Sequence, residues 1–440
     1  MLTKNLLFTC LTILISGALS AQQSAFSKLD SLFLALEQND LFMGSLTLSH
    51  QGEPIYAKAI GYADVASRKK TDTLTKFRIG SISKTFTAAL IFKAVEEGKL
   101  SLEQTIDVYF PSIPNANNIT VGQLLNHRSG LFNFTNSPDY LTWNTTEKTK
   151  AELIEIIKRG GSVFEPNTKA EYSNANYVLL SFILETVFDE TYANLLRKKI
   201  TEPLQLNHTY FGDKINLENN EANSFVYSSD WDIQTETDTS IPLGAGAVVS
   251  NPNDLNTFMK ALFDGTLISK EQLLNMKTIV DGYGMGMFQI PFHDKIGFGH
   301  NGGIDGFSSF SVYFPDDELS VALTSNGTRY NNNDLAIAAL SSFYGKPFEM
   351  PSFTTMDLSV GDLEPYIGVY SSEQIALKMT ITEADGTLYL QATGQPAFPL
   401  AATETNVFEF AAAGIRLEFE RSDNTMVLKQ GGGVFEFVKE

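Results

Sequence analysis

The sequence predicts an α+β protein in which helices flank an antiparallel sheet and a small all-β domain follows at the C-terminus. Alternating apolar and polar runs, typical of strands, occur at 44–64 and again at 295–327. A long stretch between them is mostly helical and rich in loops, and short strand-like runs with turn residues return after 363. Strands at both ends of a helical insertion indicate one sheet built from two distant parts of the chain.

The composition is that of a soluble globular protein. The chain has 440 residues, of which 43% are hydrophobic and 19% are charged, and this length predicts two or three domains. The net charge of −19 argues against a nucleic-acid partner, because binding to phosphates requires a basic face.

Residues 1–20 have the features of a secretory signal peptide. A short basic start precedes the apolar run "LLFTCLTILISGAL", and the small residues Ala18 and Ser20 suit a cleavage site. The run is too short for a comfortable membrane span, so we expect an exported chain, periplasmic or extracellular, with no stable span after cleavage. An uncleaved anchor and an ordinary first helix are the alternatives. The single cysteine, Cys10, lies in this segment, so the mature chain would have no thiol.

The elements of the first part follow from apolar spacing. Residues 26–40 have helical spacing, and 44–64 read as a hairpin around "QGEP". "KFRIGS" is a short strand that leads into a helix, and Gly98 is a plausible end for that helix. Further helices are predicted within 120–131, 176–200, 251–265 and 333–345, and strands at 295–303, 307–317 and 319–327.

The C-terminal part differs from the rest in its pattern of apolar and polar residues. Residues 346–362 break the periodicity and are predicted to be a linker between a first domain at 21–345 and a β domain at 363–440. In "IRLEFE" (415–420) apolar and charged residues alternate, as one buried face of a strand requires. A sandwich and a barrel both fit these short runs.

Ser81 and Lys84 form a Ser-x-x-Lys motif at the start of the helix that follows "KFRIGS". Residues three apart share a helix face, so the Lys84 amine could reach the Ser81 hydroxyl. A lysine becomes a useful base only when desolvation or nearby positive charge lowers its pKa, and the apolar surroundings permit this. The alternative is an ordinary serine cap beside a solvated lysine.

Two further segments carry groups suited to catalysis. Tyr172 and Asn174 lie in a loop ahead of a helix, where a phenol could shuttle a proton and an amide could hold a carbonyl. "GFGHNGG" carries His300 and then Gly302 and Gly303, which allow a ligand to approach the backbone closely. The alternatives are a simple asparagine cap and a glycine-rich hairpin with an exposed histidine.

Together and in this order, the motifs resemble those of the serine β-lactamase and penicillin-binding-protein superfamily, in its class C-like branch. That branch includes D,D-carboxypeptidases, D-aminopeptidases and esterases. Its motifs Ser-x-x-Lys, Tyr-x-Asn and Lys/His-x-Gly read here Ser81–Lys84, Tyr172–Asn174 and His300–Gly302. Flanking stretches such as "TVGQLLNHRSGL" also resemble the family, and the similarity covers about residues 26–345. It implies a β-lactamase/transpeptidase-like fold for the first domain.

The resemblance also implies an acyl-enzyme mechanism. Ser81 would attack an acyl carbon while Lys84 takes or relays its proton. Tyr172 would serve as general base and as acid toward the leaving group. Water would then release the acyl group, giving net hydrolysis.

The same resemblance implies roles in substrate binding. Asn174 would hold the acyl side chain and Lys84, and the backbone N–H groups of Ser81 and Gly303 would form an oxyanion hole. His300 would line the leaving-group or carboxylate side, and Gly302 would be a further substrate-binding residue of the same motif. His300 stands where class C β-lactamases have lysine, and a neutral histidine is a poorer anchor for a substrate carboxylate.

This departure favours peptidase or esterase chemistry over efficient antibiotic hydrolysis. The leading hypothesis is an exported serine hydrolase acting on small amides or esters, first of all D-amino-acid peptides or peptidoglycan fragments. The alternatives are a carboxylesterase or weak β-lactamase of the same fold and a non-catalytic penicillin-binding or sensor protein. A structural envelope protein whose C-terminal domain carries the function is a further alternative.

No metal is expected, because the five histidines lack metal-ligand spacing, and no cofactor is expected, because the sequence has no phosphate-binding glycine loop. "NHRSG" at 126–130 is predicted to be a structural turn. The C-terminal β domain resembles, by texture, the lipocalin-like appendages of some bacterial members of the superfamily. The oligomeric state is left open.

Overall fold

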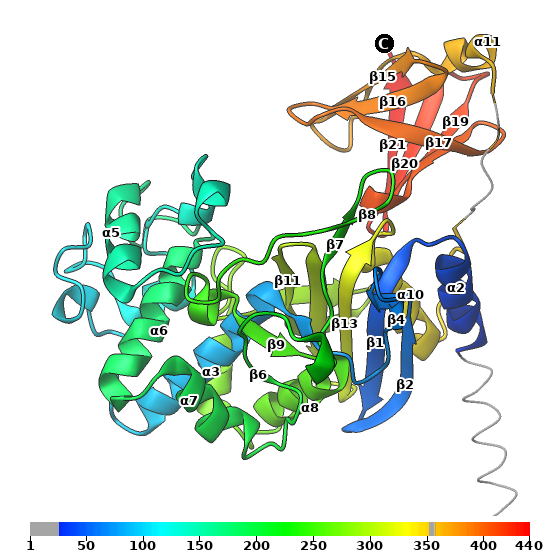
Figure 1. Ribbon diagram of the computed structural model, residues 1–440. Coiled ribbons are helices and arrows are strands. Elements are labelled where there is room, and N and C mark those ends of the chain that lie inside the picture. Colours follow the sequence, from blue (N-terminus) through cyan, green and yellow to red (C-terminus); the bar gives the residue numbers. More distant parts are fainter. Residues whose placement is uncertain (1–25, 352–355, 357) are drawn as a thin grey trace, which may run out of the picture. The chain divides into compact units, whose positions relative to one another are not determined.

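The computed structural model describes residues 26–351, 356 and 358–440, so the predicted signal segment lies outside the described residues. The chain divides into two compact units (Figure 1). The larger is Met43–Gly327. The other combines the described parts of Met1–Phe42 and Thr328–Glu440 and contains the C-terminal barrel.

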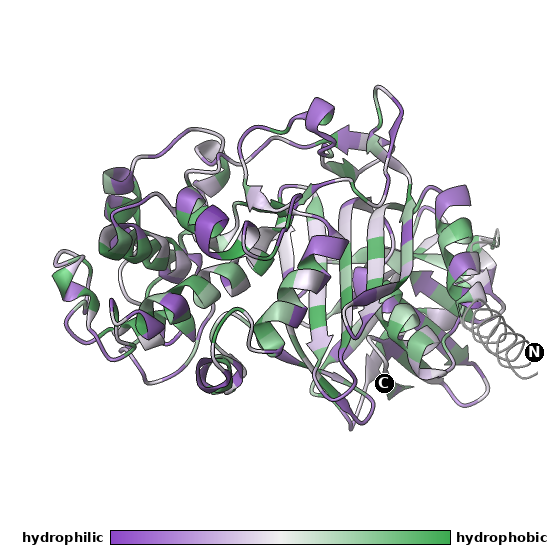
Figure 2. Ribbon diagram, turned by 90° about the horizontal axis from the view of Figure 1, so that it is seen from below, coloured by the Kyte–Doolittle hydropathy of each residue, from purple (hydrophilic) through white to green (hydrophobic). Residues whose placement is uncertain are grey.

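The main sheet has six strands in the order β10-β11-β12-β13-β1-β2. In that order the strands are β10 (Phe288–Phe292), β11 (Lys295–Ile304), β12 (Phe307–Phe314), β13 (Leu319–Thr328), β1 (Phe42–His50) and β2 (Glu53–Ile60). The neighbouring strands β1 and β13 come from opposite ends of the domain, which confirms the predicted sheet built from two distant parts of the chain. Figure 2 shows the apolar residues spread along these strands.

The neighbouring inner strands β1 and β13 are buried on both faces, which explains their nearly continuous apolar and small residues. Helix α8 (Pro252–Phe263) packs against one face of the sheet. Asn256 of this helix donates to the Thr47 carbonyl of β1 at 2.9 Å, and the Phe263 ring stacks on Tyr313 of β12 at 4.8 Å. These contacts fix α8 to the sheet and leave its opposite side for the helical core.

The helical part of the larger unit surrounds α3. Its helices are α3 (Ser83–Glu96), α4 (Val121–Leu125), α5 (Lys150–Gly160), α6 (Asn174–Phe188), α7 (Tyr192–Leu196), α8 and α9 (Lys270–Lys277). Helix α3 is buried on nearly all sides, as its apolar composition requires, and Phe86 stacks on Phe258 of α8 with 3.8 Å between ring centroids. The chain leaves this helix at Gly98, which has a positive φ of 67° and ends it as expected.

Short strands place the residues that precede α3. The strands outside the main sheet are β3 (Tyr62–Asp64), β4 (Lys69–Lys70), β5 (Phe77–Arg78), β6 (Tyr210–Phe211), β7 (Phe225–Tyr227), β8 (Trp231–Ile233) and β9 (Val248–Ser250). They form β3-β4 and β7-β8 pairs and a β5-β9-β6 sheet. A 3-10 turn, η1 (Gly80–Ile82), then connects β5 to α3.

The second unit contains α2 (Ser27–Gln38), α10 (Asn332–Tyr344), the single turn α11 (Val360–Leu363) and a closed eight-stranded barrel. The barrel strands are β14 (Gly368–Ser371), β15 (Lys378–Ala384), β16 (Thr387–Ala392), β17 (Phe398–Glu404), β18 (Val407–Phe410), β19 (Ile415–Glu420), β20 (Thr425–Gln430) and β21 (Gly433–Lys439). Each strand pairs with the next, and β14 pairs with β21, so the sheet closes on itself. Of the two predicted alternatives, the barrel is therefore correct.

The interior of the barrel is filled by side chains. Tyr366, Phe408 and Phe419 contact one another edge to face with centroid separations of 4.8 to 5.7 Å. The predicted alternation in "IRLEFE" is confirmed, because Ile415, Leu417 and Phe419 are buried while Glu420 is exposed. Across the residues that the structure describes, no helix is long and apolar enough to cross a membrane.

Candidate active site

The Ser-x-x-Lys and Tyr-x-Asn motifs meet in the larger unit. Ser81 lies in η1, Lys84 lies in the first turn of α3, and Tyr172 lies just ahead of α6. The Tyr172 hydroxyl donates to Ser81 Oγ at 2.7 Å, and Lys84 Nζ lies 3.0 Å from the same oxygen. A serine hydroxyl held between an amine and a phenol has the geometry of an activated nucleophile.

The local structure excludes the capped-helix alternative for Ser81. Helix α3 begins at Ser83, not at Ser81 as expected, and no side-chain cap bond closes either η1 or α3. The Ser83 hydroxyl accepts from the Val248 N–H at 3.1 Å, so Ser83 has a structural role. Ser81 therefore keeps its hydroxyl for Lys84 and Tyr172.

Lys84 is fully buried, so the solvated-lysine alternative is wrong. Its Nζ lies 2.7 Å from Asn174 Oδ1 and 2.6 Å from the Ala245 carbonyl oxygen. A neutral amine has two hydrogens and one lone pair. The two oxygens accept both hydrogens, and the lone pair then faces Ser81 Oγ.

The environment of Lys84 and Tyr172 sets their proton occupancy. Burial lowers the pKa of Lys84 well below its ordinary value, which favours the neutral amine. Burial raises the pKa of Tyr172 above its ordinary value and so favours the protonated phenol, although the hydrogen bond to Ser81 opposes this. The resting site therefore holds an amine that can accept a proton and a phenol that can donate one.

Asn174 is the first residue of α6, and the asparagine-cap alternative is wrong. The residue at the cap position is Ser173, which makes no side-chain cap bond. The Asn174 side chain instead accepts from Lys84 and donates to Thr135 Oγ1 at 3.1 Å, and its backbone N–H donates to Asn133 Oδ1 at 3.0 Å. These bonds fix the amide between the lysine and the loop at 133–135.

The third motif lies on β11 and only part of it reaches the nucleophile. Gly303 lines the same cavity as Ser81, whereas His300 and Gly302 are not among the residues that line it. His300 is buried against the rings of Phe288 and Tyr172, at centroid distances of 4.7 and 6.3 Å, so the exposed-histidine alternative is wrong. Burial and then the nearby Lys84 lower the pKa of His300 to about 3, so the ring is neutral at physiological pH.

Close backbone packing explains the glycines of this motif. A Cβ on Gly302 would lie 2.0 Å from the Ile79 carbonyl oxygen, and a Cβ on Gly80 would lie 2.7 Å from the Gly303 nitrogen. Strand β11 therefore packs directly on the backbone of the segment that carries Ser81. Side chains on Gly80 or Gly302 would push the two segments apart.

His127 belongs to the site and was missed in the sequence. It lies in the predicted turn "NHRSG", with a positive φ of 58°, and its buried ring stacks on Tyr172 at 4.5 Å. The Ser173 N–H donates to His127 Nδ1 at 3.2 Å. Burial, followed by the proximity of Lys84, lowers the pKa of His127 well below its ordinary value, so this ring is also neutral. Nothing in the local sequence indicates that this turn packs against a loop more than 40 residues away.

A cavity of about 400 Å³ opens beside Ser81. Its walls combine the polar side chains of Asn144, Asn174 and Thr237 with apolar groups such as Phe134 and Leu141. This size and lining suit a small acyl group with a side chain and a few polar atoms. Within the described part of the chain, no group of three or more metal-ligating side chains occurs.

Comparisons with known proteins agree with this geometry. The family model described as β-lactamase matches residues 35–342. The chain is 26% identical over 458 residues to Penicillin-binding protein 4* of Bacillus subtilis (strain 168), which spans 95% of this chain and 99% of that protein. It is 28% identical over 313 residues to the teichoic acid D-alanine hydrolase of Staphylococcus aureus (strain MRSA252), spanning 68% of this chain and 74% of that protein. The D-amino acid amidase from Ochrobactrum anthropi SV3 has a TM-score of 0.63 and 26% identity, and covers 72% of this chain and 99% of its own.

Proposed function

We propose that this chain, which belongs to the β-lactamase family and is a serine hydrolase, forms an acyl-enzyme on Ser81 with small D-aminoacyl amides or esters. One observation carries the proposal. The Ser81 hydroxyl lies within hydrogen-bond distance of both a buried amine and a half-buried phenol, at the wall of a cavity large enough for an acyl group.

The first half of the reaction begins with attack of Ser81 Oγ on the acyl carbon. The hydroxyl proton passes to the neutral Lys84 amine, which becomes an ammonium held by Asn174 Oδ1 and the Ala245 carbonyl. The negative charge that develops on the acyl oxygen is stabilised by the backbone N–H groups of Ser81 and Gly303. The Tyr172 hydroxyl then protonates the departing amine or alkoxide, and Lys84 returns the proton to Tyr172.

The second half regenerates the enzyme. A water molecule attacks the ester carbonyl on Ser81, and one of its protons passes to the neutral Lys84 amine, directly or relayed by the Tyr172 hydroxyl. The bond to Ser81 Oγ breaks, and the serine regains its proton as the free acid leaves. Each group therefore ends in its starting state.

The substrate class rests on the relatives and on His300. By name, one relative is a hydrolase of teichoic acid D-alanine and one solved structure is an amidase of D-amino acids. His300 is neutral and buried, so it offers no positive charge to the carboxylate that β-lactams carry. A D-aminoacyl substrate without that carboxylate needs no such anchor.

A substrate panel tests this proposal. D-alanine p-nitroanilide, L-alanine p-nitroanilide, p-nitrophenyl butyrate and nitrocefin would be compared on the wild type and on Ser81→Ala. We expect the D-alanyl substrate to be hydrolysed at least about 100-fold faster than its L enantiomer, and Ser81→Ala to be inactive. Equal rates for the two enantiomers with fast butyrate hydrolysis would identify a carboxylesterase instead, and fastest turnover of nitrocefin would identify a β-lactamase.

We also propose that the protein is exported. Support comes from the basic start, the apolar run and the small residues Ala18 and Ser20 of the N-terminal segment. The mass of the protein recovered from the periplasm or medium of an expressing bacterium tests this. We expect a chain that begins at Ala21, and a full-length chain found only in the cytoplasm would contradict export.

A further inference from the structure

Arg78 is a buried residue three positions before Ser81 that takes no part in the proton transfers above. We propose that Arg78 is a positioning residue that holds two separate segments, the hairpin after Gly303 and the loop that leads to Ala245, in place around Ser81. This role rests on the proposed function, because Gly303 and Ala245 matter through the reaction at Ser81.

The Arg78 side chain binds groups from three parts of the chain. It extends from β5, whose pairing with β9 fixes its backbone opposite Val249. Its guanidinium donates to the carbonyl oxygens of Thr237 and Asp213 at 2.7 and 3.0 Å. It also donates to Glu236 Oε2 at 2.9 Å and to Asp305 Oδ2 at 3.3 Å. The rigid, planar fork of arginine can bind several fixed acceptors at once, which a lysine ammonium cannot do with the same geometry.

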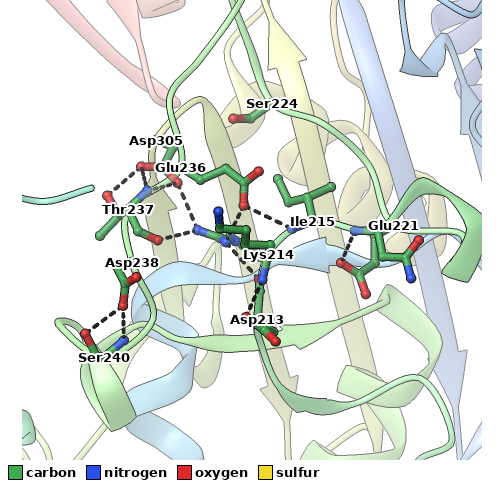
Figure 3. A network of polar contacts seen from close by, with 12 residues as sticks. Asp213, Lys214, Ile215, Glu221, Ser224, Glu236, Thr237, Asp238, Ser240 and Asp305 are labelled. Carbon is green, nitrogen blue, oxygen red and sulfur yellow. Dashed lines mark hydrogen bonds and ion pairs between the residues drawn. The ribbon is translucent and has the colours of Figure 1, made fainter. Parts of the chain in front are cut away.

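Asp305 connects Arg78 to strand β11, which carries the Gly303 N–H of the proposed oxyanion hole. It lies at the turn between β11 and β12, two residues after Gly303, and has a left-handed φ of 53°. Its carboxylate accepts from the Thr237 N–H at 3.1 Å and from the Thr237 hydroxyl at 2.6 Å (Figure 3). The turn that follows Gly303 is therefore tied to the loop at Thr237 by side-chain bonds.

The loop at Thr237 connects the same network to Lys84. Asn144 Nδ2 donates to Thr237 Oγ1 at 2.9 Å, and Figure 3 shows Asp238 and Ser240 continuing the polar contacts along the loop. The loop then enters a 3-10 turn, η7 (Leu243–Ala245), whose last carbonyl accepts from Lys84. Thr237 is thus bonded to Asp305 and Asn144 independently of Arg78. Arg78 in turn joins two segments, the β11–β12 turn at Asp305 and the loop at Thr237, to the strand β5 that leads into Ser81.

The position of the β11–β12 turn and of the Thr237 loop matters because both segments lie next to the nucleophile. The backbones of Gly80 and Gly303 are in direct contact, and both Gly303 and Thr237 line the cavity beside Ser81. A shift of the hairpin relative to β5 would move the Gly303 N–H away from the developing oxyanion. Displacements of about 1 Å at a reacting centre can cost about 100-fold in rate.

The test compares Arg78→Lys with a matched variant, Arg416→Lys. Arg416 lies in the barrel and donates to Glu404, Glu409 and Glu418. Arg416→Lys therefore also loses a guanidinium that binds several acceptors at once. Three properties would be measured: kcat and KM for D-alanine p-nitroanilide, the rate at which a fluorophosphonate labels Ser81, and the unfolding temperature. For Arg78→Lys we expect kcat and the labelling rate to fall about 100-fold, with KM changed less than about threefold because Thr237 keeps its bonds to Asp305 and Asn144. Arg416→Lys should match the wild type in kcat and labelling.

A second variant, Asp305→Asn, can keep the Oδ1 oxygen that accepts from the Thr237 N–H and hydroxyl, and it replaces Oδ2, which accepts from Arg78 and also from the Thr237 N–H. If the two residues act through one contact, the double variant Arg78→Lys/Asp305→Asn loses no more activity than Arg78→Lys alone. A folded Arg78→Lys protein with the wild-type labelling rate would overturn the proposal, as would an equal loss in Arg416→Lys.

Hydrogen exchange separates failure of this proposal from failure of the proposed function. A wild-type protein that fails to label at Ser81 would contradict the proposed function. The placement of the two segments would then be read from the peptides that cover 303–305 and 243–246. We expect faster amide exchange in both peptides of Arg78→Lys, and exchange equal to that of the wild type would overturn the positioning role.

Discussion

At the scale of single residues, the proposed mechanism depends on a lysine that is uncharged before substrate binds. Lys84 is fully buried, and the two neighbouring imidazoles, His127 and His300, are themselves neutral because their pKa values are lowered. Burial keeps Tyr172 protonated by raising its pKa. Of these four groups, Lys84 is therefore the one whose protonation would switch the site off.

The first prediction concerns pH. Below its lowered pKa, Lys84 is an ammonium and cannot accept the Ser81 proton, whereas above that pKa it is a free amine. The rate of Ser81 labelling should therefore rise with pH and reach a plateau well below pH 10.5, the ordinary pKa of a lysine. The labelling rate between pH 5 and 10 measures this. A rate that falls as pH rises through neutrality would contradict the assignment of Lys84 as the base.

The second prediction concerns Tyr172→Phe. This change removes the hydroxyl that donates to Ser81 and keeps the ring that stacks on His127. We expect kcat to fall about 100- to 1,000-fold, as for loss of a general acid, with little change in unfolding temperature. The matched control is Tyr192→Phe, which removes a buried hydroxyl 2.7 Å from Thr87 Oγ1. It should cost about 1 kcal/mol of stability and leave kcat unchanged.

At the scale of elements, the site depends on how closely β11 packs against η1. A Cβ at Gly302 would overlap the Ile79 carbonyl at 2.0 Å and Ser309 Oγ at 2.4 Å, whereas a Cβ at Gly303 would have its nearest contact at 3.9 Å. Gly302→Ala should therefore lower the unfolding free energy by about 1–3 kcal/mol and also reduce kcat. Gly303→Ala should keep the wild-type unfolding temperature. Equal unfolding temperatures for the two variants would contradict the close packing.

The elements themselves could largely be predicted, because their signals are local. The apolar spacing of α6 and the alternation in β19 are visible within a dozen residues. Contacts between distant segments carry no such signal. His127 looks like a residue of an ordinary turn until α6 places Tyr172 against it, and Arg78 meets Asp305 only because β5 and the β11–β12 turn lie together.

For the site residues too, local relationships could be predicted and contacts between distant segments could not. The pairing of Ser81 with Lys84 could be predicted from helical spacing, although the intervening turn is 3-10 and α3 begins two residues later. The burial of His300 could not be predicted, because it depends on Phe288 from the edge strand β10. Local sequence therefore indicated which residue types could react, and only the fold shows how they are oriented.

At the scale of the whole molecule, the barrel has its own closed hydrogen bonding and its own core. The amidase of Ochrobactrum anthropi, of which 99% is matched by 72% of this chain, shows that related chains exist at about this shorter length. We expect a truncated chain, residues 26–345, to fold and to label at Ser81 within about threefold of the rate for residues 21–440. An unfolded or unlabelled truncated protein would instead indicate that the barrel is needed for the fold or the site.

The central claim is that turnover passes through a covalent bond to Ser81. The most direct test is mass spectrometry of the protein quenched in acid during hydrolysis of a D-alanyl ester. We predict a mass increase equal to one D-alanine minus water, located on the peptide that contains Ser81 and absent in Ser81→Ala. Turnover with no adduct on that peptide, together with activity that survives in Ser81→Ala, would contradict the account.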